Sequence, residues 1–337
     1  MNNTALTNKE KGYFPTVNLL RGIATLLVCF CHFTSYNDFR GDLFPADSAI
    51  VKLGLAGFYG VFMFFVISGF VIPFSMARSG YKIKDIHRFL LRRFVRIEIP
   101  YVVSILLMIL IESVFALKNG DSFSVQPVRI LYHILFTIPF SGYSWYNPIF
   151  WTLAIEFQFY VLIALIYPLI THRIKIIQYV TIVLFGASGF LLDDIRYLFG
   201  FSLFFLQGML LFLIMTKRIN LALGWIFLIV CTALNHYHHA NAEIAFSIGA
   251  VLSIAFLNIN TKITNSIGEI SYSLYLTHGL VGMNLIYLLA RYVHNDVLKY
   301  LLIVSAFVVS VAFAYVFAKY VEDPSARLSK KVKVHGE

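Results

Sequence analysis

The residues with the clearest potential for chemistry are an arginine and a histidine inside the first hydrophobic segment. Arg21 and His32 lie eleven residues apart, which on an α-helix places both side chains on one face, about 16 Å apart along the axis. This separation is too long for direct contact but suits two stations along a groove through a membrane. Ionisable residues at such positions are costly and typically functional. An arginine that reaches back to the interface and a histidine bonded within the bundle explain the pair equally well.

A second group of candidates is a cluster of arginines just before another apolar segment. Arg93 and Arg96 are three residues apart, and Arg92 and Arg96 are four apart, so a helix would present their guanidinium groups side by side. Such groups bind phosphate oxygens in a bidentate manner. Taken alone, the cluster, which also includes Arg88, is explained better by cytoplasmic topology and contact with anionic lipids.

The third candidate is a carboxylate. Glu156 lies eight residues into an apolar segment that begins near residue 148, and at that depth it needs a partner or a proton. Because His32 lies near the outer end of its own segment, we expect the two side chains to meet. Glu156 would then orient the imidazole for proton abstraction. An ordinary buried ion pair or a protonated glutamate is the alternative.

A polar stripe follows near the end of the chain. Tyr272, Tyr275 and His278 recur every three residues, so on a helix they share one face. The stripe either lines a cavity or supplies hydrogen bonds between helices. Three histidines within residues 236–239 lack the spacing of a closed metal site, and we expect no metal.

These residues must be positioned by a membrane-embedded scaffold. The chain of 337 residues is 59% hydrophobic and only 13% charged, a composition typical of polytopic helical membrane proteins rather than of soluble domains. The expected fold class is therefore all-α, with one membrane domain over residues 1–337. Apolar segments predict about ten transmembrane helices, at 15–36, 50–77, 97–117, 148–170, 175–193, 195–216, 221–237, 242–259, 267–293 and 298–320.

The distribution of basic residues orients these segments. The net charge of +10 does not indicate nucleic-acid binding, because the Lys and Arg residues fall in short clusters between apolar runs. Nineteen of them fall on one side of the predicted membrane and seven on the other, which places both termini in the cytoplasm. Arg21 interrupts the first apolar run, so we expect that run to be retained and not cleaved as a signal peptide. Within the longest outer connection, residues 127–136 predict an interfacial or re-entrant helix.

The order and spacing of these motifs resemble acyltransferase family 3, the integral membrane O-acyltransferases that modify bacterial surface glycans and related acceptors. The resemblance extends from Leu20 to Pro324, with departures at Asn18, Thr152 and Glu98-Ile99 that remove no residue assigned to chemistry. It rests on Leu20-Arg21-Gly22-Ile23-Ala24 with His32, Phe65-Val66-Ile67-Ser68-Gly69-Phe70, Arg92-Arg93 with Arg96-Ile97 and Pro100-Tyr101, Trp151 to Glu156 with Phe159-Tyr160, Ser271 to His278, and Glu322 with Pro324.

The resemblance implies an enzyme of the bacterial cytoplasmic (inner) membrane that uses cytoplasmic acyl-CoA, most often acetyl-CoA, as donor. It implies a hydroxyl of a surface or lipid-linked glycan as acceptor. The resemblance implies that Arg93 and Arg96 bind the coenzyme A phosphates and that Arg21 binds the donor further along the cofactor. The resemblance also makes His32 the general base, supported by Glu156.

The oxyanion donor, the reaction route and the class of protein each have more than one candidate. Tyr272, Tyr275 or His278 is a weak candidate to stabilise the developing oxyanion. An acyl-histidine intermediate competes with direct transfer. The rival class is a transporter or flippase of a lipid-linked glycan, which explains the helices and buried charges but not the arginine cluster together with the histidine–glutamate pair. The sequence does not define the oligomeric state, the acceptor sugar or the acyl chain.

Overall fold

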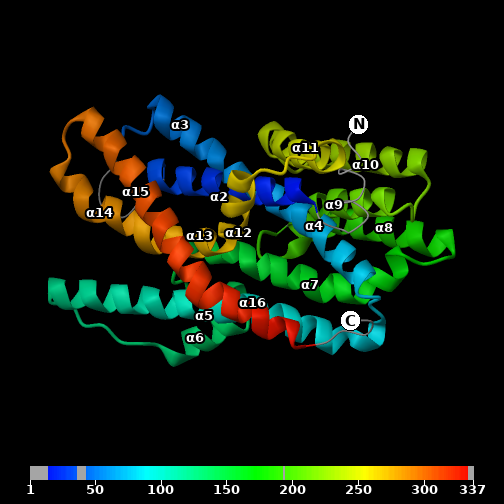
Figure 1. The fold of residues 1–337 in the computed structure, drawn as a ribbon, viewed down its shortest axis with the longest axis horizontal. Helices are drawn as coiled ribbons and strands as arrows, with labels where there is room; N and C mark the ends of the chain where they lie inside the picture. Colours follow the sequence, from blue (N-terminus) through cyan, green and yellow to red (C-terminus); the bar gives the residue numbers. More distant parts are fainter. Residues whose placement is uncertain (1–13, 36–42, 193, 333–337) are drawn as a thin grey trace.

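The computed structural model describes residues 14–35, 43–192 and 194–332, and this part of the chain contains helices and no strand. The helices form an elongated bundle in which most long helices run along the long axis (Figure 1). Their bounds are α2 Pro15–Thr34, α3 Ala49–Ala56, α4 Gly60–Arg78, α5 Ile86–Asn119, α6 Pro127–Ile134, α7 Trp151–Ile170, α8 Lys175–Leu191, α9 Ser202–Met215, α10 Leu221–Asn235, α11 Asn241–Phe256, α12 Lys262–Glu269, α13 Ser271–His278, α14 Asn284–Leu289, α15 Asp296–Phe317 and α16 Asp323–Lys330.

Seven helical segments of the described chain are long and apolar enough to cross a membrane. Three further apolar helices, α8, α10 and α11, have 15 to 17 residues, fewer than the roughly 20 needed to cross in a straight line. The protein is thus an all-helical, multi-pass membrane protein, and the count of ten crossings stays a prediction. The prediction that both termini are cytoplasmic applies to residues 1–13 and 333–337, which lie outside the described residues, and it stays a prediction. The segments with crossing length are Pro15–Thr34, Ala49–Arg78, Ile83–Asn119, Pro148–Ile170, Leu198–Met215, Ser271–Tyr292 and Asp296–Lys330.

The centre of the bundle is the contact between α4 and α9. Every residue of α9 except Met215 is buried. A methyl group on Gly69 would lie 2.1 Å from the carbonyl oxygen of Phe205, and one on Gly208 would lie 2.1 Å from that of Val66. Only glycine therefore permits this approach of the two backbones, as expected for helices that pack within a membrane. The close approach thus falls within the Phe65–Phe70 motif of the family resemblance.

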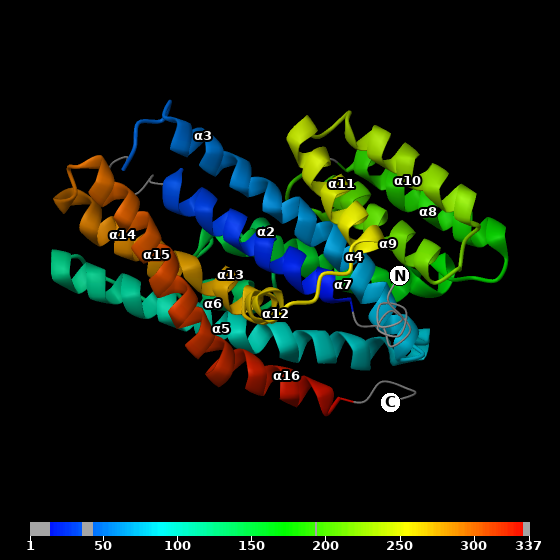
Figure 2. The same ribbon diagram turned by 45° about the horizontal axis from the view of Figure 1, so that its top comes forward.

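Helix α2 lies in the interior and contacts α3, α4, α12 and α13 (Figures 1 and 2). It begins at Pro15, which suits a first turn because its missing N–H has no partner there. Thr25 Oγ1 donates to the carbonyl oxygen of Arg21 at 2.9 Å and to that of Ser271, on α13, at 3.2 Å. The helix that carries Arg21 and His32 is thereby fixed beside the helix that carries the polar stripe.

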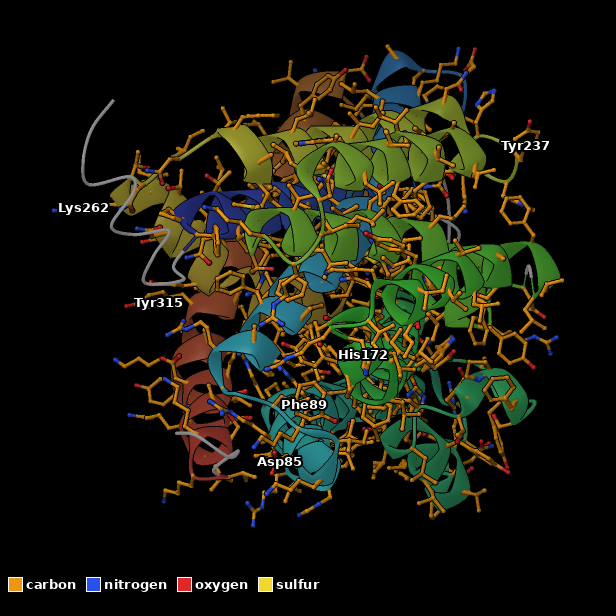
Figure 3. All side chains as sticks on the ribbon, turned by 90° about the vertical axis from the view of Figure 1, so that its right-hand side faces the viewer. Asp85, Phe89, His172, Tyr237, Lys262 and Tyr315 are labelled. Carbon is orange, nitrogen blue, oxygen red and sulfur yellow. The ribbon has the colours of Figure 1, made fainter. Side chains whose placement is uncertain are left out.

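Two helices change their hydrogen-bond register close to candidate residues. A π-helical turn at Gly279–Met283 follows His278 directly, and another at Ala318–Glu322 continues α15. Such turns are rare and occur frequently at functional sites. Figure 3 shows the bundle from the end at which α5 begins, with side chains filling the space between the helices. In this view Asp85 and Phe89 lie close together, whereas Lys262 and Tyr237 lie on opposite sides of the bundle.

Candidate functional site

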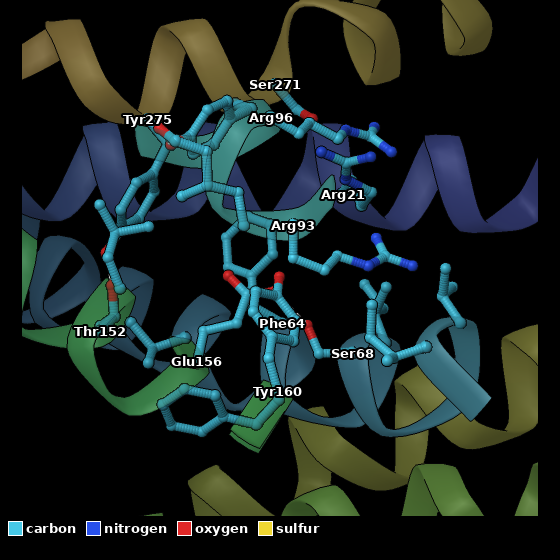
Figure 4. A pocket seen from close by; sticks show the side chains of 18 of the residues that line it. Arg21, Phe64, Ser68, Arg93, Arg96, Thr152, Glu156, Tyr160, Ser271 and Tyr275 are labelled. Carbon is cyan, nitrogen blue, oxygen red and sulfur yellow. Dashed lines mark hydrogen bonds between the residues drawn. The ribbon is translucent and has the colours of Figure 1, made fainter. Parts of the chain in front are cut away.

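The first cavity, which we call the arginine cavity, is lined by three cationic side chains from two helices. Arg21 comes from α2, and Arg93 and Arg96 come from α5. Figure 4 shows the three guanidinium groups gathered on one side, opposite Thr152 and Tyr275. The volume of about 150 Å³ is below the roughly 300–1,000 Å³ of typical ligand pockets. In this conformation the cavity therefore accommodates a fragment of a large ligand.

Two carboxylates balance part of this charge. Glu156 lines the arginine cavity and accepts hydrogen bonds from Ser68 Oγ at 2.8 Å and Tyr160 Oη at 2.5 Å. Glu322 also lines it and accepts from Ser273 Oγ at 2.5 Å. Both carboxylates interact electrostatically with the guanidinium group of Arg21 and favour its positive charge. With three arginines against two glutamates, the cavity keeps a net positive charge suited to an anionic ligand.

Only two of the four arginines in the cluster, Arg93 and Arg96, line the arginine cavity. Arg93 donates to Ser75 Oγ at 3.2 Å, and its guanidinium lies over the rings of Phe89 and Tyr160. These contacts hold the side chain of Arg93 in a fixed orientation at the cavity. Arg88 is exposed, and the lining of the arginine cavity includes neither it nor Arg92.

The second cavity, which we call the histidine cavity, has a volume of about 390 Å³. It contains His32 from the end of α2, whereas Arg21 from the same helix lines the arginine cavity. The two residues therefore line two different cavities along one helix, whereas their spacing suggested two stations along one groove. The polar residues that line the histidine cavity are His32, Glu112, Asn119, Asp121, Tyr146, Asn147, Asn284 and Tyr287.

His32 is paired with a second histidine. His32 Nδ1 lies 2.9 Å from His278 Nε2, and His278 Nδ1 lies 2.8 Å and 3.1 Å from the carbonyl oxygens of Tyr275 and Leu274. Since carbonyl oxygens only accept, the hydrogen-bond network assigns the proton of neutral His278 to Nδ1. Its Nε2 then accepts from His32 Nδ1–H. This assignment leaves the basic lone pair of neutral His32 on Nε2.

The expected pairing of His32 with Glu156 is wrong. Both residues are described, and Glu156 bonds with Ser68 and Tyr160 on the arginine cavity, while His278 takes the place beside His32. The depth of Glu156 along its helix suggested the contact, but the rotation of α7 turns the carboxylate toward α4. Glu156 therefore belongs to the arginine cavity.

The tyrosines of the polar stripe already have partners in the described structure. Tyr272 Oη donates to the carbonyl oxygen of Ile97 at 2.9 Å. Tyr275 Oη lies 2.6 Å from Thr152 Oγ1 and 3.1 Å from the carbonyl oxygen of Ile149. Tyr275 and Thr152 both line the arginine cavity, and neither lines the histidine cavity. Because this contact lies on the side of the arginine cavity opposite the guanidinium groups, we infer that it is part of a wall between the two cavities.

A free hydrogen-bond donor is found instead on Asn147, which sequence reasoning missed. Asn147 is 2% exposed, and its Oδ1 accepts from the backbone N–H of Ile149 at 3.3 Å. Its Nδ2 is buried and has no hydrogen-bond partner in the part of the chain that the structure describes. A methyl group on Gly279, the neighbour of His278, would lie 2.7 Å from this nitrogen. An unpaired buried donor costs about 1–3 kcal/mol, and Asn147 is among the residues that line the histidine cavity.

The segment that carries Asn147 is anchored by the short helix α6, the helix predicted within residues 127–136. His133 is fully buried; its Nδ1 lies 2.8 Å from Tyr101 Oη, and its Nε2 accepts from the N–H of Tyr146 at 3.3 Å. Burial, with a smaller contribution from the charge of Arg129, lowers the pKa of His133 to about 3. The ring is therefore neutral at pH 7 and holds the chain just before Asn147.

Fold and site together define a helical membrane protein with a cationic cavity and a histidine-centred cavity joined by one helix. The chain belongs to acyltransferase family 3, since the family model, described as an acyltransferase domain, matches residues 14–319. The resemblance noted from the motifs is confirmed, and the protein is a membrane acyltransferase in general terms. A comparison with curated proteins finds no match, and a comparison with solved structures finds none either.

Proposed function

We propose that the protein transfers an acyl group, most simply acetyl, from cytoplasmic acyl-CoA to a hydroxyl of a surface or lipid-linked glycan. The proposal includes ten crossings, cytoplasmic termini and a location in the bacterial cytoplasmic membrane. The observation that carries it is the division of one helix, α2, between two cavities. Arg21 serves the cationic one and His32 the other, as a reaction with a donor and an acceptor on opposite sides requires.

The arginine cavity is assigned to the donor. Arg93 and Arg96 suit the phosphates of coenzyme A, because guanidinium forks bind phosphate oxygens through paired hydrogen bonds. Arg21, about three helical turns before His32, would hold the donor nearer to the wall. The small volume of the cavity fits part of the pantetheine arm, and entry of the thioester requires the Thr152–Tyr275 contact to open.

The histidine cavity is assigned to the acceptor. His32 Nε2 removes the proton of the acceptor hydroxyl as the oxygen attacks the thioester carbonyl carbon. The new C–O bond forms, the C–S bond breaks, and the imidazolium returns its proton to the departing thiolate, which leaves as coenzyme A. His278 holds the tautomer of His32 and accepts from the imidazolium that forms. Asn147 Nδ2 donates to the oxyanion, a role that Tyr272 and Tyr275 serve less well because their hydroxyls have other partners.

One experiment separates this proposal from the transporter. The protein is purified in lipid nanodiscs and supplied with acetyl-CoA, and release of coenzyme A thiol is followed with and without membrane extract as acceptor source. We expect release that depends on the extract and falls about 10²–10⁴-fold in His32→Ala. His236→Ala, at an exposed histidine after α10, is the matched control and keeps wild-type activity. A transporter would release no coenzyme A.

The acceptor is identified in cells. Deletion of the protein should remove O-acyl signals from the NMR spectrum of surface polysaccharide, and wild type but not His32→Ala should restore them. Acylated enzyme that accumulates without acceptor would replace direct transfer by the acyl-histidine route. Full transferase activity of correctly inserted His32→Ala would refute both mechanisms.

A further inference from the structure

A third cavity adjoins the histidine cavity and differs from it in charge. Its volume is about 530 Å³, and the two cavities share Phe115, Asn119 and Tyr287 in their linings. Because three side chains border both spaces, a ligand portion in one is a direct neighbour of a ligand portion in the other. We call this third space the basic cavity.

The charged residues of the basic cavity come from three separate segments. Lys118 lies at the end of α5, Arg291 follows α14, and Lys299 lies in the first turn of α15. His294 completes the set, and none of the described lining residues is acidic. Asp296, outside the lining, pairs with Lys299 at 3.1 Å. Lys118 and Arg291 are exposed and accessible to a ligand.

The fold brings these three cations to the lining of one cavity. Helix α5 ends at Gly120, whose left-handed backbone (φ 76°) stops the helix directly after Lys118 and Asn119. Tyr287 precedes Arg291 by four residues, and the 3-10 turn Ala290–Tyr292 that follows α14 leaves both side chains in the lining of the basic cavity. Two of the three shared lining residues thus adjoin a cation.

The histidine cavity is lined by acidic residues, in contrast to the basic cavity. Glu112 and Asp121 line it beside His32, so an anionic group placed next to the base would meet like charge. A ligand with a hydroxylated part and a separate anionic part is oriented by this contrast. Its hydroxyls would face His32 and its anion would lie among Lys118, Arg291 and Lys299.

We infer that the basic cavity binds a phosphate group of the acceptor, next to the part of the acceptor that is acylated. The inference rests on the proposed function for its role in catalysis, and it restricts the acceptor to hydroxylated compounds that carry a phosphate. The phosphate has two sources with the same chemistry: a lipid carrier or headgroup, or a phosphodiester within a polymer. Arginine and lysine together suit phosphate through a fork and a compact point charge.

Binding tests the inference without a transfer assay. The protein in phosphatidylcholine nanodiscs is titrated by calorimetry with inorganic pyrophosphate, with dodecyl phosphate, and with neutral dodecyl β-glucoside as control. We expect both phosphates to bind and the Lys118→Gln/Arg291→Gln double variant to bind at least tenfold more weakly. Lys52→Gln, an exposed lysine on α3 at the same end of the bundle (Figure 1), should bind as wild type does.

The variants also separate the two anion sites. Pyrophosphate bound in the arginine cavity would be lost in Arg93→Gln, whereas binding in the basic cavity survives that change. Binding of dodecyl phosphate alone points to a lipid source, and binding of both probes supports recognition of the phosphate itself. The inference is overturned if neither phosphate binds, or if the double variant binds like wild type. Release of coenzyme A by wild type but not His32→Ala would in that case leave the proposed function standing.

Discussion

The pair of histidines gives the sharpest prediction. In the structure His278 Nε2 accepts from His32 Nδ1, and the backbone carbonyls of Leu274 and Tyr275 hold the other ring nitrogen of His278. Two substitutions separate these contacts. A glutamine at position 278 reaches about as far as Nε2 and keeps an acceptor for His32. An asparagine ends near the position of Nδ1 and does not reach His32.

The size of the effect follows from the charge that His32 gains. Hydrogen bonds to charged groups contribute about 1.5–3 kcal/mol, and each 1.36 kcal/mol of barrier is tenfold in rate. Loss of the acceptor for the imidazolium therefore lowers kcat by about 10- to 150-fold in His278→Asn. His278→Gln should lose less than tenfold, and His32→Ala should lose more than either because the base itself is gone.

Steady-state release of coenzyme A from nanodisc-embedded protein measures these differences, with the KM for acetyl-CoA determined in parallel. Since His278 lines neither cavity, KM should stay near the wild-type value while kcat falls. A second readout is the 15N NMR signal of His32, which reports the tautomer and should change in His278→Asn. Wild-type kcat in correctly inserted His278→Asn would refute the positioning role.

Three further predictions address the donor amide, the packing and the anchor. Asn147→Asp keeps the acceptor for the backbone but replaces the free N–H by an oxygen, so kcat should fall about 10²–10³-fold in the same assay, and an unchanged kcat would exclude Asn147 as an oxyanion donor. Gly208→Ala places a methyl group 2.1 Å from the carbonyl oxygen of Val66 and should cost about 1–3 kcal/mol, seen as a lower midpoint of thermal unfolding in detergent. Gly249→Ala, where nothing lies within 4 Å, is the control and should unfold at the same temperature or higher. For His133, burial holds the folded pKa at about 3, below its unfolded value near 6.5; the unfolded form therefore binds the proton first, and stability is lost as pH falls below 6.5. The loss is about 1.4 kcal/mol per pH unit, roughly 2 kcal/mol at pH 5. Hydrogen-exchange protection of residues 127–148, corrected for the slower intrinsic exchange at low pH, should therefore fall at pH 5 in wild type but not in His133→Gln.

The sequence predicted features that depend on one helix alone. The shared face of Arg21 and His32 follows from helical periodicity, and so does the shared face of Arg93 and Arg96, which both line the arginine cavity. The partner of Glu156 could not be predicted, because sequence gives the depth of a residue along a helix but not the rotation of that helix in the bundle. A signal was present in the spacing of Glu156 and Tyr160, four residues apart, which face the same side.

Residues outside the long helices were harder still. Asn147 lies in a connection, and its proposed role depends on an amide that has no partner among the described residues, a property visible only once its neighbours are placed. Glu322 was noted only at the end of the family resemblance, yet it lines the arginine cavity because a π-helical turn precedes α16. A buried acid at the end of the last apolar segment is the signal that would have indicated it.

In the proposed mechanism, the wall between the cavities would couple binding of the donor to the position of His278, the partner of His32. Tyr275, which bonds with Thr152 in this wall, lies three residues before His278 on α13. A movement of α13 that breaks the Thr152–Tyr275 contact therefore also shifts His278 relative to His32, and the π-helical turn after His278 is the place where the helix can change register. With the wall closed, the thioester would be kept from His32 and from water in the histidine cavity. We expect Thr152→Ala, which removes one side of this contact, to increase hydrolysis of acetyl-CoA without acceptor relative to transfer.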